Sequence, residues 1–489
     1  MKKLWLSVFL FSYFFHLAAQ PFKLQVNIKN QPFNTVTVGA LRGDRFIIAD
    51  SLLTQNIMTR TGPVKTATWN IPPDTRPGVY RIVLGQTTYA RVMDESPQQV
   101  DFIFNGEDVR FETDFRFPAD SLKLIHSEEN KVWFEFIRQE MDLRNKINDL
   151  EKEEAFYNSM LSEAESSGSD SKVKIEEIKA SREQVANQFN LMQMQREEFI
   201  TRMAEEHNSL FVSKIIKCYR EPLRDGFLTP VERKAFFQKN YLGYLDFSDE
   251  ALVQSSVLTE KIFTYLVSYN QKEYTQDQRQ NAYIKAVDAI MADVIKEGGE
   301  YSEVYEFVVD YLVTGFEGLK MDKVLTWISD HYSAPLCKTE EKTTLRRKLE
   351  AQKMTVGTVV PDFTLNDLKG QPVNLSKTLK EMNLVVFWAS WCPHCTSLLP
   401  QIKSLCTGKI NLEVIAVSLD RSANEWNNAV YKAGFETYRN LSDLSEWNGK
   451  VVEDYNIYAT PSMFLIDENR KIIAKPTSIQ ELAKAIAAF

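Results

Sequence analysis

Apolar and polar residues alternate along the N-terminal part of the chain, from Phe22 to about Phe117. A period of two is typical of strands with one buried face. Asn105-Gly106, followed by another alternating segment, is a strong signal for a hairpin turn. We therefore predict an antiparallel β-sandwich over residues 20–120, in which no pattern indicates catalysis. Its strand-like segments include Thr35–Leu41, Arg45–Ser51, Thr66–Ile71, Val79–Leu84 and Val100–Phe104.

The pattern becomes helical between residues 121 and 354, where we predict an all-α region. Within it, two stretches on either side of Gly168 carry apolar residues at the three- and four-residue spacing of a heptad repeat. The first stretch contains Trp133, Phe136, Leu143, Ile147, Leu150, Tyr157 and Leu161. The second contains Ile175, Ile178, Val185, Phe189, Met192, Phe199 and Met203.

The polar residues of these two seams have opposite signs. If the chain folds back at Gly168, Glu154 becomes level with Arg182 and Glu140 with Arg196. Polar seam residues of opposite charge fix the register of paired helices. We predict a long antiparallel coiled-coil hairpin, with two helices packed separately on a larger bundle as the alternative. The helical region is also a candidate homodimer interface, a spacer or a docking arm.

A third pattern begins near residue 355, where we place the start of the last domain. Leu384–Ala389 is a continuous apolar run of the kind found in strands buried on both faces. The segment Trp391-Cys392-Pro393-His394-Cys395 follows at once, and a helical pattern starts there. This order places Cys392 at the first turn of a helix.

A cysteine at a helix N-terminus suits thiol–disulfide chemistry. The partial positive charge of the helix end and its free N–H groups stabilise the thiolate of Cys392, which is the nucleophile. Cys395 lies one turn later and can resolve a mixed disulfide. Pro393 suits the first helical position. A protonated His394 would stabilise the thiolate further and make the disulfide more oxidising.

The ends and totals of the sequence narrow the setting. Met1-Lys2-Lys3, an apolar stretch and Ala18-Ala19 form the pattern of a secretory signal over residues 1–19, and an uncleaved inner-membrane anchor is the alternative. From this signal we expect a periplasmic protein, and that compartment suits a CxxC motif because disulfides persist there. The net charge of −8 and the pI near 5.5 argue against a nucleic-acid partner, which would require a basic face.

The five cysteines permit other interpretations. A zinc site would need two further ligands, and the chain has no second CxxC and no close His pair, so we expect no metal. A purely structural disulfide between Cys392 and Cys395 is the other alternative. Cys406, Cys218 and Cys337 are predicted core residues, with a bond between the last two left open.

The region from Val356 to Phe489 resembles the thioredoxin superfamily, in its exported TlpA/ResA-like branch. The resemblance rests on the W-C-x-x-C motif after a strand, on Pro400 inside the following helix, and on Ala459-Thr460-Pro461 before Ser462–Asp467. It implies an α/β thioredoxin-like domain over residues 355–489. It also implies that Pro461 is cis and that Trp391, Thr460 and Pro461 contact an extended substrate segment.

Two departures from this family concern acids that assist proton transfer at the buried cysteine. Val386 stands six positions before Cys392, where cytoplasmic thioredoxins have Asp. Leu398 stands three positions after Cys395, where much of the TlpA/ResA-like branch has Glu. The sequence therefore leaves open how Cys395 loses its proton.

The resemblance implies a reductase of exported proteins, fed by a membrane-embedded electron donor and using no cofactor besides the Cys392–Cys395 disulfide. Three alternatives remain from the sequence. The Pro-His dipeptide favours an oxidant or isomerase of the same chemistry. Val360-Pro361-Asp362-Phe363 also opens peroxidase domains, although the residues before Cys392 lack the peroxidase pattern. The third alternative is a binding or assembly protein with a secondary redox domain.

Overall fold

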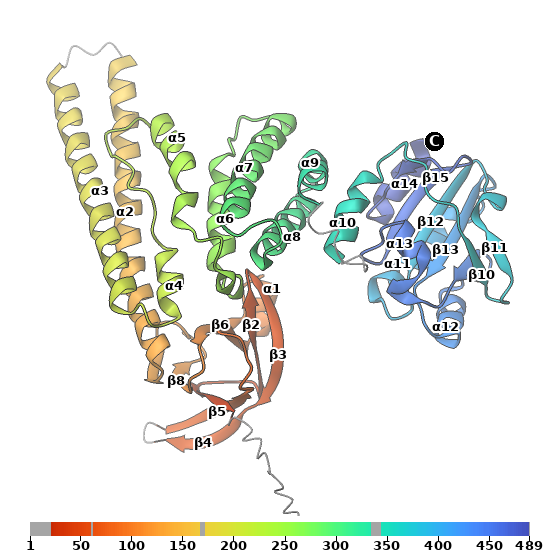
Figure 1. Ribbon diagram of the computed structural model, residues 1–489, viewed down its shortest axis with the longest axis horizontal. Helices are drawn as coiled ribbons and strands as arrows, with labels where there is room; N and C mark the ends of the chain where they lie inside the picture. Colours follow the sequence, from red (N-terminus) through yellow and green to blue (C-terminus); the bar gives the residue numbers. More distant parts are fainter. Residues whose placement is uncertain (1–20, 60–61, 167–171, 334–343, 489) are drawn as a thin grey trace, which may run out of the picture. The chain divides into compact units, whose positions relative to one another are not determined.

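The computed structural model describes residues 21–59, 62–166, 172–333 and 344–488. The predicted signal segment 1–19 and Cys337 lie outside these ranges. The described chain forms two compact units, residues 1–268 and 269–489, which we treat separately (Figure 1). Among the described helices, none combines the length and the apolar character needed to cross a membrane.

The first unit begins with two sheets that share one core. The five-stranded sheet has the order β4-β5-β1-β8-β9 and the four-stranded sheet the order β3-β2-β6-β7. Alternate residues of both sheets are buried together, and the rings of Phe102 and Phe111 approach to 6.2 Å between centroids. The strands are β1 (Phe22–Lys29), β2 (Thr35–Arg42), β3 (Arg45–Leu53), β4 (Gln55–Thr59), β5 (Gly62–Ile71), β6 (Gly78–Gly85), β7 (Gln98–Phe104), β8 (Val109–Asp114) and β9 (Lys123–His126), with the short helix α1 (Thr88–Val92) before β7.

The hairpin predicted at Asn105-Gly106 was wrong. Gly106 does adopt a left-handed φ of 68°, as a tight turn requires. However, β7 pairs with β6, whereas β8 runs parallel to β1 in the other sheet. The turn therefore carries the chain from one sheet to the other, because Phe104 and Val109 on its two sides both enter the shared core.

Two long helices dominate the rest of the first unit. α2 (Glu128–Ser166) and α3 (Lys172–Glu206) lie side by side, with α4 (Val212–Lys217) and α5 (Pro230–Asn240) beside them (Figure 1). Phe136, Ile147, Val185 and Phe189, all from the predicted apolar rows, are buried. The unit is completed by the 3-10 turns η1 (Leu242–Tyr244) and η2 (Glu250–Gln254) and by α6 (Val257–Ser268).

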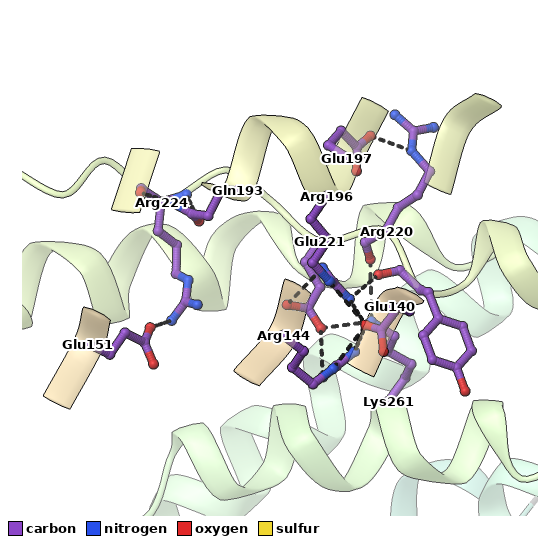
Figure 2. Close-up of polar contacts among 11 residues, drawn as sticks. Glu140, Arg144, Glu151, Gln193, Arg196, Glu197, Arg220, Glu221, Arg224 and Lys261 are labelled. Atoms are coloured by element: carbon purple, nitrogen blue, oxygen red, sulfur yellow. Dashed lines mark hydrogen bonds and ion pairs between the residues drawn. The ribbon is translucent and has the colours of Figure 1, made fainter. Parts of the chain in front are cut away.

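A cluster of buried charges holds these helices together (Figure 2). Arg196 of α3 contacts Glu140 of α2 at 2.7 Å, which confirms this predicted pair. Arg144 joins the same carboxylate at 2.7 Å, and Glu221 accepts from Lys261 of α6 at 3.2 Å. Burial raises the pKa of Glu221, but the cations beside it prevail and lower it to about 2.

The other predicted pair was wrong in its partner. Both carboxylate oxygens of Glu154 accept hydrogen bonds from Arg233 of α5, at 2.7 and 2.8 Å, in place of the expected Arg182. Arg233 reaches this position because the chain returns along the helix pair after α4. The helices are thus part of a larger arrangement with α5, which the pattern of the two seams alone does not reveal.

The second unit consists of helices followed by a seven-stranded sheet. Its helices α7 (Gln276–Glu297), α8 (Glu303–Gly318), α9 (Asp322–Tyr332) and α10 (Thr344–Lys353) precede the sheet, whose order is β11-β10-β14-β13-β12-β15-β16. The strands are β10 (Thr364–Asp367), β11 (Pro372–Asn374), β12 (Met382–Trp388), β13 (Leu412–Ser418), β14 (Arg439–Ser442), β15 (Ser462–Asp467) and β16 (Ile472–Ala474). Between and after them lie η4 (Leu375–Lys377), α11 (Pro393–Cys406), α12 (Ala423–Ala433), η5 (Glu446–Asn448), α13 (Lys450–Asp454) and α14 (Ile479–Ala488).

Strand β12 lies inside this sheet, between β13 and β15, and leads directly to the cysteine motif. Every residue of β12 is buried, as the continuous apolar run predicted. It runs parallel to β13 and antiparallel to β15. The backbone N–H of Leu419, just after β13, donates to the carbonyl of Trp388 at 2.8 Å. This bond fixes the end of β12 and hence the place where the next helix begins.

The Glu140 cluster can be tested by amide hydrogen exchange on the full chain. Glu140→Gln removes one charge from a buried group, and we expect a loss of about 3 kcal/mol, or roughly a hundredfold faster exchange, in peptides of α2 and α3. Lys152→Gln is the matched control on α2, since Lys152 pairs with Asp149 in water. Equal exchange in the two variants would contradict a stabilising role for the cluster.

Candidate functional site

The site is built where β12 ends and α11 begins. Cys392 is the N-cap of α11, with extended backbone angles, and Pro393 occupies the first helical turn. The Sγ of Cys392 accepts a hydrogen bond from the backbone N–H of Cys395 at 3.3 Å. Such N–H groups have no partner inside the helix, so they are available to a cap. The sequence therefore places this sulfur where the helix end stabilises negative charge.

The loop before β15 lies against the same sulfur. The thiol of Cys392 donates to the carbonyl of Thr460 at 3.4 Å. The peptide bond between Thr460 and Pro461 is cis, as the family resemblance implied. The structure thus brings the Cys392–Cys395 turn against the loop with Thr460 and Pro461, although the two segments are far apart in the sequence.

The two cysteines have opposite pKa shifts. Burial raises the pKa of Cys392, but hydrogen bonds from the side chains of Cys395 and Thr460 and from the backbone N–H groups of Cys395 and His394 prevail and lower it. Burial and then the hydrogen bond to the Cys392 thiol raise the pKa of Cys395 to about 12. Cys392 keeps 6% of its surface accessible, whereas Cys395 keeps none. One sulfur is thus suited to attack an external partner and the other to remain protonated until it is needed.

Three other predicted site residues lie at exposed positions next to Cys392. Pro393 and His394 are exposed on the first turn of α11. Trp391 is 49% exposed, and its ring lies 6.2 Å from the ring of Trp447 in η5. The two tryptophans form an aromatic surface beside Cys392, of which the sequence had indicated only the first member.

A buried acid that the sequence interpretation missed supports the loop before Cys392. Asp420 is fully buried just after β13, and its carboxylate accepts from the Ser390 hydroxyl at 2.6 Å and the Ser390 N–H at 3.1 Å. The hydroxyl of Ser418 donates to it at 2.6 Å. Polar residues at the carboxyl ends of adjacent parallel strands gather at one edge of a sheet, and this was the available signal.

The positions of the two missing family acids hold apolar side chains. Val386 is fully buried within β12, and Leu398 is half-buried on α11. Neither can accept a proton. Asp420 comes from a different strand from either position, and its hydrogen bonds go to Ser390 and Ser418.

The remaining described cysteines lie apart from this pair. Cys218 and Cys406 are buried free thiols, and burial raises their pKa values to about 12 and about 11. Cys392 and Cys395 are also in the dithiol form. Within the described ranges, no group of three or more His, Cys, Asp or Glu residues has the arrangement to hold a metal ion.

The domain that holds this site is similar to known proteins. Residues 356–475 match the model of the AhpC/TSA family. The chain is similar to thiol-disulfide oxidoreductase ResA of Bacillus thuringiensis subsp. konkukian, at 26% identity over 25% of this chain and 69% of that protein. The corresponding ResA of Geobacillus kaustophilus is 29% identical over 25% and 70%.

Among solved structures, the thioredoxin domain of a thiol-disulfide oxidoreductase from Bacteroides vulgatus is similar at 26% identity. That match covers 28% of this chain and 97% of the other, with a TM-score of 0.26. The family model and the curated relatives confirm the resemblance inferred from the motifs. The C-terminal domain is thioredoxin-like and of the ResA/TlpA-like branch.

The opposite pKa shifts predict different alkylation of the two cysteines by iodoacetamide. Only thiolate reacts, so Cys392 should react half-maximally below the pKa of about 8.5 of a free cysteine. Cys395 should stay unmodified until the pH approaches its pKa of about 12. Mass spectrometry across a pH series measures both, with Cys406 of the same helix as an internal control. Modification of Cys395 in parallel with Cys392 would contradict the assignment.

Proposed function

We propose that the protein is a thiol–disulfide oxidoreductase that acts through Cys392 and Cys395, and that it works as a reductase of exported proteins. The observation that carries this proposal is the position of the Cys392 sulfur, which accepts the Cys395 N–H at the start of α11 and has a lowered pKa. A nucleophilic thiolate that keeps some accessible surface, paired with a fully buried thiol one turn later, is the arrangement that disulfide exchange requires.

In the reductase direction, the Cys392 thiolate attacks one sulfur of a substrate disulfide. A bond forms between Cys392 and that sulfur, and the other substrate sulfur leaves as a thiolate that takes up a proton. Cys395 then loses its proton and attacks Cys392, which releases the second substrate thiol. Two electrons pass to the substrate, and the protein is left with a Cys392–Cys395 disulfide.

The residues around the sulfur have assigned roles in this scheme. The Thr460 carbonyl faces Cys392, and Thr460 and Pro461 would bind the backbone of an extended substrate segment. Trp391, half exposed beside the nucleophile, would contact substrate side chains. Pro393 and His394 would tune the stability of the Cys392 thiolate, because both lie in the turn whose N–H groups face the sulfur. Asp420 would hold the loop that precedes Cys392.

The setting of this activity follows from the N-terminal segment 1–19, which has the pattern of a secretory signal. We propose a periplasmic location, with an anchor at the inner membrane as the alternative. A dithiol that has been oxidised there needs a fresh pair of electrons, so we propose a membrane-embedded donor that reduces the Cys392–Cys395 disulfide. A homodimer through the helical region stays a prediction.

One observation favours the opposite direction. The hydrogen bonds that lower the pKa of Cys392 stabilise the reduced form, and a more stable reduced form makes a more oxidising disulfide. An oxidant or isomerase is therefore the second candidate function. Both directions use the same two cysteines and the same mixed disulfide.

The two-step mechanism predicts different phenotypes for the two cysteines. Cys395→Ser can form the mixed disulfide and cannot resolve it, so a covalent complex with a disulfide-containing protein should accumulate. Cys392→Ser should form no such complex and should lose nearly all turnover, about a thousandfold or more. Non-reducing electrophoresis detects the complex, with insulin as the disulfide-containing protein. Loss of the complex after a reductant is added is the control, and Cys406→Ser is the matched neutral variant. A complex formed equally by Cys392→Ser would exclude the proposed nucleophile.

A further inference from the structure

The helices that precede the thioredoxin-like domain contact two loops that flank Cys392. One loop is η5 with its neighbours, which carries Trp447. The other runs from Tyr458 to Pro461 and carries the carbonyl that faces the Cys392 thiol. Helices α8 and α10 and both loops belong to the same compact unit. We call α8 and α10 the helical brace.

The first contact of the helical brace is made through Tyr458. Its hydroxyl donates a hydrogen bond to the carboxylate of Glu317 at the end of α8. Lys348 of α10 lies 5.8 Å from the centre of the Tyr458 ring and 4.0 Å from the same carboxylate. Burial, followed by the bond to Glu317, raises the pKa of Tyr458. Two residues after Tyr458, the carbonyl of Thr460 accepts the hydrogen bond from the Cys392 thiol.

The second contact is made through Arg347 of α10. Its guanidinium donates to the backbone carbonyl of Trp447 at 2.9 Å. The Trp447 ring in turn lies 6.2 Å from the ring of Trp391, which is the residue immediately before Cys392. The two contacts therefore lead from one pair of helices to both neighbours of the nucleophile, Trp391 on one side and Thr460 on the other.

We propose that the helical brace positions these two loops and thereby shapes the surface on which a polypeptide substrate lies across Cys392. This inference rests on the proposed function. Tyr458 and Arg347 are positioning residues in this scheme, since they act through Thr460 and Trp447. The substrate class is an extended polypeptide with a disulfide, whose backbone lies on the Thr460 loop and whose neighbouring side chains lie on the two tryptophans.

Other contacts already attach the helices to the domain, so attachment alone does not account for these two. Lys320, just after α8, forms an exposed ion pair with Glu481 of α14 at 2.7 Å. Lys475 donates to the carbonyl of Ala351 in α10 at 2.9 Å. The Lys320–Glu481 pair provides a matched control, because it belongs to the same interface and neither residue lies in either loop.

The test compares a large and a small disulfide substrate in the full chain. Dithiothreitol is the electron source for insulin, and pre-reduced protein freed of dithiothreitol is the only reductant for Ellman's reagent. Tyr458→Phe removes the hydroxyl and keeps the ring, and Arg347→Met removes the donor and keeps an unbranched side chain. For insulin we expect kcat/KM to fall by about fivefold or more in each variant, mainly through KM. For Ellman's reagent, which needs no extended surface, we expect rates within about twofold of wild type.

Several results would overturn the inference. It fails if both variants reduce insulin as fast as Lys320→Gln does, or if both substrates slow equally, which would indicate general damage to the domain. Arg347→Lys should recover part of the insulin activity, and no recovery would count against the hydrogen bond to Trp447. If wild-type protein reduces neither substrate, the proposed function itself fails, and that outcome is distinct from the others.

Discussion

The chemistry of this protein depends on one constraint, the attachment of a helix N-terminus to the end of a fully buried strand. β12 is fixed by neighbours on both sides, so the position of its last residue is set by the core of the domain. The helix that follows presents free N–H groups at that point, and Cys392 is the residue that caps them. Its sulfur is activated by backbone groups that cannot easily move away.

The surroundings of this sulfur separate the tasks of the two cysteines. Cys392 lies at the surface end of the turn, where hydrogen bonds outweigh the effect of burial on its pKa. Cys395 lies inward, where burial prevails and its thiol stays protonated. Asp420 holds the loop before Cys392 through its hydrogen bond with Ser390, and the Thr460 carbonyl contacts the Cys392 sulfur. The segment from Ser390 to Cys395 is therefore held by contacts with two other parts of the sequence, at Asp420 and Thr460.

Local patterns in the sequence were enough to predict the cysteine pair and the buried strand before it, because each is encoded within a few residues. The loop with Pro461 was predicted from the resemblance to the thioredoxin superfamily. Alternation also predicted the strands of the first unit, and the helical spacing predicted the Glu140–Arg196 pair. Features that depend on distant segments were not predictable in this way. Arg233 forms the ion pair with Glu154 because the chain returns along the helices through α5. The Asn105-Gly106 turn joins two sheets because β8 pairs with β1. Asp420 and the contacts of Tyr458 and Arg347 likewise depend on tertiary packing.

The most direct test is the reduction potential of the Cys392–Cys395 pair, measured by equilibrating the full chain with glutathione or dithiothreitol buffers. If the pair is used for reduction, we expect a reversible two-electron transition at about −270 mV, the value of thioredoxin. A value near about −120 mV, as in DsbA, would reverse the proposed direction. If no disulfide forms between Cys392 and Cys395 at any potential, the proposed function itself is contradicted.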